Sequence, residues 1–151
     1  MALLASSLLD APLRRPASPG NAAIVRSLYA AFSRLAQNGE IAAYVAGHFH
    51  PDCEYWPVEE VSPIGGHEAL TNWIQRWLEA WDDAWDVVEE IVEDGEVVVT
   101  ATRVYGRGRR SGMEISQRLF DVFELRDGKV LRVTEYLDRE GALQAAGLLH
   151  L

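Results

Sequence analysis

Strand-length segments joined by short turns fill the second half of the chain, and this succession restricts the fold more than any other feature of the sequence. Four segments rich in β-branched and aromatic residues follow one another at 85–92, 97–105, 113–125 and 130–137. Asp94-Gly95 and Asp127-Gly128 are dipeptides typical of β-hairpin turns, and a glycine-bracketed run, G-R-G-R-R-S-G, joins the middle two segments. Three hairpin connections in a row predict an antiparallel meander.

The first half of the chain has helical periodicity instead. Asn21 can cap a helix whose apolar positions recur from Ile24 to Leu35, and Asn38-Gly39 supplies its end. Further elements are expected as helices at about 40–46, from 67 to about 81 and at 139–146, and as a strand at 52–58. Helices before strands predict an α+β fold, in which three N-terminal helices pack on one face of a curved sheet.

Composition limits the classes of function. The chain has 151 residues and a formal net charge of -9, which fits one soluble domain and argues against nucleic acid or an anionic membrane surface as a partner. No apolar run is long enough to span a bilayer. Cys53 is the sole cysteine, so no internal disulfide can form and a reducing, cytoplasmic location is expected. Residues 1–20 are interpreted as a flexible lead-in to a single domain over 21–151.

An acid within an apolar strand points to function. In L-F-D-V-F-E-L, strand alternation places Asp121 on the same face as Leu119 and Phe123. Phe120 and Val122 then occupy the opposite face. Asp121 therefore has apolar neighbours whichever face is buried, and an unpaired ionised carboxylate is costly in such a place. We expect this carboxyl to be paired, hydrogen-bonded or protonated.

The order of the elements occurs together with four motifs, G-E-I-A-A-Y, E-Y-W-P, F-E-L-R-D-G-K-V and E-Y-L-D-R-E-G-A-L-Q-A-A-G-L. With them, residues 21–148 resemble the SnoaL-like branch of the nuclear transport factor 2-like superfamily. The resemblance implies a cone, in which a strongly bent antiparallel sheet wraps around the helices and leaves a central pocket open at one end. It also implies a homodimer. Members include ketosteroid isomerases, polyketide cyclases, dehydratases and epoxide hydrolases as well as proteins that only bind, so the fold leaves function open.

Ketosteroid isomerases provide one template for the site. A protonated aspartic acid on their penultimate strand donates a hydrogen bond to the developing oxyanion, and Asp121 matches that place. Their base precedes a proline on the first strand, where this chain has Trp56 before Pro57. Their oxyanion tyrosine, on the first helix, corresponds to Phe32. Two of the three parts of this template are therefore missing.

Limonene-type epoxide hydrolases provide a second template, with an arginine, an aspartate two residues later and another acid on the last strand. The resemblance places Arg103, Tyr105 and Glu135 at these positions, and Tyr55 on the first strand. One acid has thus become Tyr105, which alters the pair that would orient and activate a water molecule.

Both templates predict which side chains face the inner wall of the cone. The expected catalytic residues are Asp121, Glu135, Arg103 and Tyr105. The expected ligand-binding residues are Tyr55, Trp56, Phe32, Trp73, Trp77, Gln117 and Leu119. Two explanations remain open for an acid among apolar neighbours: Asp121 forms an ion pair with Arg103, or Asp121 is protonated.

Neither a metal nor an organic cofactor is expected. The spacing His48-x-His50-x-Asp52-x-Glu54 spans Pro51 and a predicted helix end, so these side chains would not share one face. The first hypothesis for function is a cofactor-independent isomerase, cyclase, dehydratase or epoxide hydrolase. Its substrate would be a small, apolar, oxygen-bearing molecule of polyketide, steroid or terpenoid type, and its chemistry acid–base catalysis. The alternatives are a non-catalytic ligand-binding or dimerisation module, and a structural domain whose cone is filled by side chains.

Overall fold

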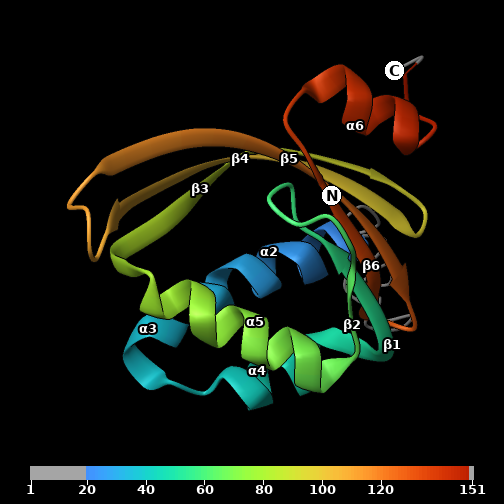
Figure 1. Ribbon diagram of the computed structural model, residues 1–151. Helices are drawn as coiled ribbons and strands as arrows, with labels where there is room; N and C mark the ends of the chain where they lie inside the picture. Colours follow the sequence, from blue (N-terminus) through green and yellow to red (C-terminus); the bar gives the residue numbers. More distant parts are fainter. Residues whose placement is uncertain (1–19, 150–151) are drawn as a thin grey trace, which may run out of the picture.

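A six-stranded sheet bends over a layer of helices in the computed structural model, which describes residues 20–149 (Figure 1). The strand order is β2-β1-β6-β5-β4-β3. The strands are β1 (Phe49–Trp56), β2 (Ile64–Gly65), β3 (Trp81–Asp94), β4 (Val97–Gly108), β5 (Glu114–Arg126) and β6 (Lys129–Tyr136). The helices are α2 (Asn21–Phe32), α3 (Leu35–Asn38), α4 (Ile41–His48), α5 (His67–Glu79) and α6 (Arg139–Ala145). The α+β fold with a curved sheet is confirmed.

The meander from β3 to β6 is antiparallel throughout, as predicted. The strand β1 is the exception to the expected antiparallel sheet, because it pairs with β6 in parallel. This pairing starts at Phe49, so β1 begins three residues earlier than its composition indicated. Most of the predicted lead-in, residues 1–19, lies outside the described residues.

Two predicted helix boundaries were wrong. The helix expected from Asn21 to Asn38 is interrupted at Ser33, whose hydroxyl donates a hydrogen bond of 2.7 Å to the carbonyl of Ala30 and competes with the regular helical ladder. Trp81 belongs to β3 rather than to α5, since its backbone pairs with Gly108 in the β3–β4 hairpin. Pairing across the hairpin thus overrides the helical spacing of the tryptophans.

Both faces of the sheet are covered along the parts of β4 and β5 that lie beneath α6. The inner face packs on α2, α4 and α5 through a core that includes Val25, Leu70 and Phe123. The outer face carries a second apolar cluster beneath α6. This cluster includes Phe120 of β5 and Leu143 of α6. Residue 121 is therefore enclosed between two apolar layers. No helix within residues 20–149 has the length and apolar character needed to cross a membrane.

Candidate functional site

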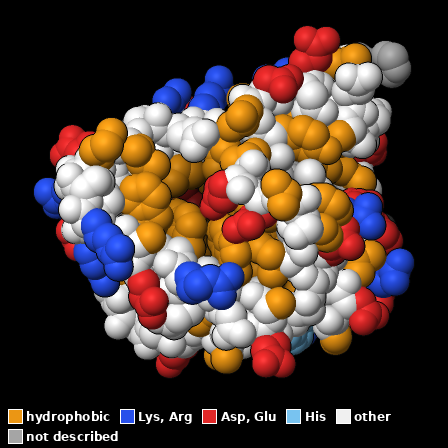
Figure 2. Space-filling model, viewed as in Figure 1, with side chains coloured by type: hydrophobic (Ala, Val, Ile, Leu, Met, Phe, Trp, Pro, Cys, Tyr) orange, Lys and Arg blue, Asp and Glu red, His pale blue; other side chains and the backbone are white. Residues whose placement is uncertain are grey.

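A cavity of about 420 Å³ lies between the inner face of the sheet and the helices. Figure 2 shows it as a hollow with hydrophobic walls and acidic side chains beside its opening. The aromatic residues that line it are Tyr29, Phe32, Tyr44, Phe49, Tyr55, Trp73, Trp77, Trp81, Trp85 and Phe123. An open cavity of this kind contradicts the hypothesis of a cone filled by its own side chains.

Asp121 lies on the wall of this cavity, in the middle of β5, with only 7% of its surface exposed. Its Oδ2 accepts a hydrogen bond of 2.7 Å from the hydroxyl of Tyr29. Its Oδ1 is buried and has no hydrogen-bond partner among the described residues. Burial raises the pKa of Asp121 well above its ordinary value, and the charge of Glu135 raises this pKa further.

Tyr29 is a residue of the site that sequence reasoning missed. It comes from α2, and its hydroxyl also lies 2.8 Å from Oγ1 of Thr100 on β4. Its ring meets the edge of Phe123 at 5.9 Å between centroids. Counting along the first helix led instead to Phe32, which lies three residues later and lines the same cavity. The spacing of Tyr29 and Phe32 was the available signal. Positions i and i+3 share a helix face, so a pocket residue at position 32 indicates that position 29 also faces the pocket.

Glu135 stands directly opposite Asp121 in the β5–β6 register. Its Oε2 accepts a hydrogen bond of 2.6 Å from the Tyr55 hydroxyl, and its Oε1 accepts one of 3.1 Å from the backbone N–H of Val58. Side chains directly opposite on neighbouring strands lie about 5 Å apart at Cβ, so two carboxylates there repel each other. The pKa of Glu135 is raised, chiefly by burial.

Two further carboxyls line the cavity, from Glu59 in the β1–β2 connection and from Asp86 on β3. Burial raises the pKa of Asp86. The sequence analysis did not single out Asp86. In the structure Ala84 and Asp86 are the less exposed positions among exposed neighbours on β3, because this face of the strand is turned toward the cavity. No lysine, arginine or histidine of residues 20–149 lines this cavity.

Arg103 and Tyr105 do not line the cavity. Thr102 and Val104 do, so strand alternation directs the two predicted residues to the outer face of β4. The Nε of Arg103 lies 4.0 Å from Oε2 of Glu89, and the ring of Tyr105 stacks on Trp85 at 5.2 Å. The expected positions of these two side chains on the inner wall, and the pairing of Arg103 with Asp121, are therefore wrong.

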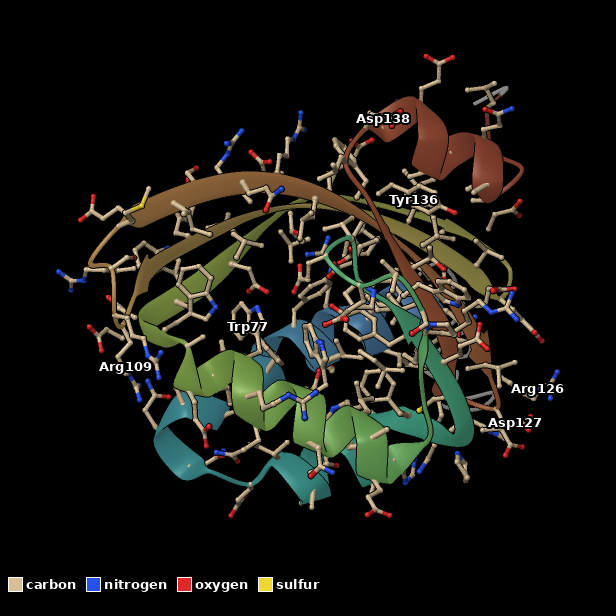
Figure 3. All side chains as sticks on the ribbon, viewed as in Figure 1. Trp77, Arg109, Arg126, Asp127, Tyr136 and Asp138 are labelled. Carbon is tan, nitrogen blue, oxygen red and sulfur yellow. The ribbon has the colours of Figure 1, made fainter. Side chains whose placement is uncertain are left out.

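The other predicted ligand-binding residues reach the cavity with one exception. Those that line it are Phe32, Tyr55, Trp73, Trp77, Gln117 and Leu119. Figure 3 shows Trp77 directed from α5 into the space beneath the sheet. Trp56 is the exception, since its indole N–H donates to Glu54 and 37% of the residue is exposed.

Metal-ligating side chains are not gathered in the part of the chain that the structure describes, where no group of three or more His, Cys, Asp or Glu residues could hold an ion. His48, the first residue of the histidine-rich spacing, places its Nδ1 2.8 Å from the carbonyl oxygen of Tyr44 within its own helix. The cavity is thus an enclosure of aromatic rings and carboxyls.

Comparison with known proteins gives one family and many structures of the same fold. The family described as the SnoaL-like domain matches residues 25–133. No curated protein matches the chain. A protein of ketosteroid isomerase-like fold from Catenulispora acidiphila DSM 44928, in complex with trimethylamine, is 16% identical with a TM-score of 0.66, over 83% of this chain and 92% of that one.

Two further solved structures have similar scores. TerC co-crystallised with polyporic acid is 19% identical with a TM-score of 0.65, over 87% of this chain and 98% of that one. A candidate SnoaL-like polyketide cyclase from Jannaschia sp. CCS1 is 19% identical with a TM-score of 0.61, over 88% and 94% of the two chains. At these identities the likeness shows the fold alone.

Proposed function

The chain belongs to the SnoaL-like domain family, and on that premise we propose that it is a cofactor-independent enzyme acting by acid–base catalysis. Its substrate is a small, largely apolar, oxygen-bearing molecule. The reaction is an isomerisation, cyclisation, dehydration or epoxide opening, each of which needs a proton delivered to, or a hydrogen bond donated to, a substrate oxygen.

The observation that carries the proposal is the unpartnered Oδ1 of Asp121. Oδ2 is occupied by the Tyr29 hydroxyl, so Oδ1 is the carboxyl atom left to meet a ligand in the cavity. Burial raises the pKa of this carboxyl and so favours its protonated form, which can donate a proton or a hydrogen bond to a ligand oxygen. Asp121 is the proposed general acid, and Tyr29 fixes its orientation.

Glu135 has a different proposed role, because both of its oxygens already accept hydrogen bonds from Tyr55 and Val58. Its negative charge opposite Asp121 favours the protonated form of that residue. Two coupled carboxyls titrate as a pair, so we expect the pair to share one proton in the working pH range.

The proposal is tested with Asp121→Asn and Glu135→Gln. Turnover of a substrate found in a panel of enolisable carbonyl compounds and epoxides should fall about 100-fold or more in Asp121→Asn, since general acid–base catalysis contributes about that much. Glu89→Gln is the matched control, because Glu89 lies on the outer face beside Arg118. Normal turnover by both site variants would refute the proposal.

A second candidate is a non-catalytic ligand-binding protein. It is favoured by the outward direction of Arg103 and Tyr105, which leaves the cavity without the complete catalytic set of either template. This candidate predicts a small molecule that co-purifies and stays unchanged during prolonged incubation, as measured by mass spectrometry. Conversion of that molecule would exclude it. A homodimer and a cytoplasmic location remain predictions in either case, and light scattering in solution tests the first.

A further inference from the structure

We propose that the ligand of this cavity carries a protonated amine, which lies against the indoles of Trp77 and Trp81 with Asp86 as its counter-charge. The oxygen-bearing end of the same ligand reaches Asp121. This inference rests on the proposed function in that it names the class of substrate. Its test measures binding rather than turnover, so the two proposals can fail separately.

The charge of the lining is the first argument. Four carboxyls, those of Glu59, Asp86, Asp121 and Glu135, line one cavity, and no basic side chain among residues 20–149 lines it with them. An anionic ligand would be repelled there. A neutral ligand would leave the charge of Asp86 uncompensated, whereas a cation beside it would compensate that charge and favour the ionised form of Asp86, which burial disfavours.

Asp86 is the acid of β3 that lines the cavity, and no ion pair of the described residues includes it. Asp82 lies 3.2 Å from Arg109, and Glu90 lies 2.7 Å from Arg139. The hydrogen bond that acts on the Asp86 carboxyl comes from its own backbone, and burial still raises its pKa. The titratable groups near it, Tyr29, Tyr44 and Asp121, come from α2, α4 and β5, and none of them is a cation at neutral pH.

Aromatic rings near the same end of the cavity supply the second element of a cation site. Trp77 lies 5.9 Å from Trp81 and 5.7 Å from Phe32 between ring centroids. Both tryptophans are only half-buried and border open space, so their faces are available to a ligand. An alkylated ammonium group over the face of tryptophan is attracted by the negative π-face of the ring.

The position of Trp81 depends on a residue without a side chain. A Cβ added at Gly106 on β4 would stand 3.0 Å from Cε3 of Trp81. Gly106 pairs with Ala84, so two small residues leave room for the indole on the inner face of the β3–β4 hairpin. The ring therefore covers the sheet at this end and forms a wall of the cavity.

Asp121 is an independent pointer to a ligand. It is more than nine-tenths buried, it lines the cavity, and its Oδ1 has no partner among the described residues. The cavity therefore has two binding points of different chemistry. Asp86 and the nearby tryptophans fit an amine, and the proton donor Asp121 fits an oxygen at the other end of the ligand. Amino alcohols, amino ketones and amino ethers are such ligands.

A pair of probes tests the charge preference. The first is 3-(dimethylaminomethyl)phenol, which is protonated at neutral pH, and the second is its uncharged isostere 3-isobutylphenol. Their affinities are measured by calorimetry or by the quenching of tryptophan fluorescence. We expect the amine to bind at least about tenfold more tightly, since a desolvated cation–π contact and one counter-charge together supply such a ratio.

Asp86→Asn should bring the ratio of the two affinities close to one while the isostere still binds. Asp82→Asn is the matched control on the same strand, and it should leave the ratio unchanged because Asp82 faces Arg109 outside the cavity. An isostere that binds wild type as tightly as the amine, or no measurable binding of the amine, would overturn the inference. Both results come from wild-type protein, so they stand even if a variant fails to fold.

The outcome separates the two proposals. Loss of turnover in Asp121→Asn without a preference for the amine would remove the inference and leave the acid–base function in place. A preference for the amine that depends on Asp86, together with normal turnover in Asp121→Asn, would do the reverse.

Discussion

On the outer face of the sheet Glu89 lies 3.0 Å from Arg118 and Glu90 lies 2.7 Å from Arg139, whereas on the inner face Asp121 and Glu135 are held by tyrosine hydroxyls. The strand β3 contributes acids to both faces, since Asp86 of the same strand lines the cavity. The outer acids lie beside arginines in contact with water, and the hydrogen bond from Arg139 lowers the pKa of Glu90. The inner acids have raised pKa values because burial disfavours their charge.

This contrast shows how strand alternation separates two kinds of acid that look alike in the sequence. Composition indicates an acidic chain, and only the face on which each carboxyl lies decides whether it is a solvated charge or a reactive group. The predictions below test the contrast, from the largest expected effect to the smallest.

Tyr29→Phe should destabilise the protein by about 1–3 kcal/mol. The change leaves Oδ2 of Asp121 buried without its donor, and an unsatisfied buried acceptor costs about that much. Tyr105→Phe, on the outer face, should change the free energy of unfolding by no more than about 0.5 kcal/mol. Urea denaturation measures both. Equal effects of the two changes would mean that the hydrogen bond from Tyr29 to Asp121 adds no measurable stability.

Stability should fall as the pH rises through the mildly acidic range. The folded-state pKa of Asp121 lies above its ordinary value of 3.8, so its contribution is fully present below that value and is lost as the pH rises through the raised pKa. Asp121→Asn should flatten this decline, although Asp86 and Glu135 leave part of it because their pKa values are also raised.

The pH effect is measured by denaturation midpoints from about pH 4 upward, since the raised pKa values place the loss of stability above the ordinary values of these groups. Glu90→Gln serves as the outer-face comparison and should not flatten the decline, because Arg139 lowers the pKa of Glu90 and the contribution of this pair is lost as the pH falls. The carboxyl of Asp121 can also be titrated directly by carbon-detected NMR. An ordinary or depressed pKa for this carboxyl would contradict its assignment as the proton donor.

Gly106→Ala should cost about 1 kcal/mol and weaken the binding of ligands. The new methyl group would meet Trp81 at 3.0 Å, which forces the indole to shift into the cavity. Gly47→Ala is the control, because nothing lies within 4 Å of an added Cβ there and the helix α4 gains from alanine. The thermal unfolding midpoint should therefore fall in Gly106→Ala and rise in Gly47→Ala, whereas probe affinity should fall in Gly106→Ala and stay unchanged in Gly47→Ala.

Arg118→Met should have the smallest effect. It removes an exposed ion pair with Glu89 and a cation–π contact of 5.1 Å with Phe120, and such surface contacts contribute about 0–1 kcal/mol. The loss should shrink at high salt, as urea denaturation at two ionic strengths would show. A loss above 2 kcal/mol, well beyond that range of about 1 kcal/mol, would indicate that the outer face is more than a solvated surface.

Local sequence signals were sufficient for much of the fold. The turn dipeptides Asp94-Gly95 and Asp127-Gly128 and the alternation around Asp121 predicted the meander and the buried acid. The facing of β4 was not predictable in the same way. The facing of β4 depends on its register with β5, in which Thr100 lies opposite Asp121. An irregular connection joins these two strands, so no two-residue turn indicates this register in the sequence.

Residues contributed by other elements were also beyond local signals. Tyr29 meets Asp121 from α2, a separation of 92 positions along the chain, and no spacing rule connects them. The resemblance supplied Asp121, Glu135 and Tyr55 as candidates, whereas Asp86 required knowledge of which face of β3 is covered. Pairwise contacts across the cavity, rather than patterns along one element, decide this part of the site.

The hydrogen bond from the Val58 amide to Glu135 gives the protein a built-in spectroscopic probe of its cavity. The shielding of an amide proton changes when the acceptor gains or loses charge, so the chemical shift of the Val58 N–H should follow the ionisation of Glu135. Because Glu135 and Asp121 titrate together, that one backbone signal should also respond when a ligand changes the protonation of the pair. Ligands could then be ranked by their effect on the acids without any label at the acids themselves.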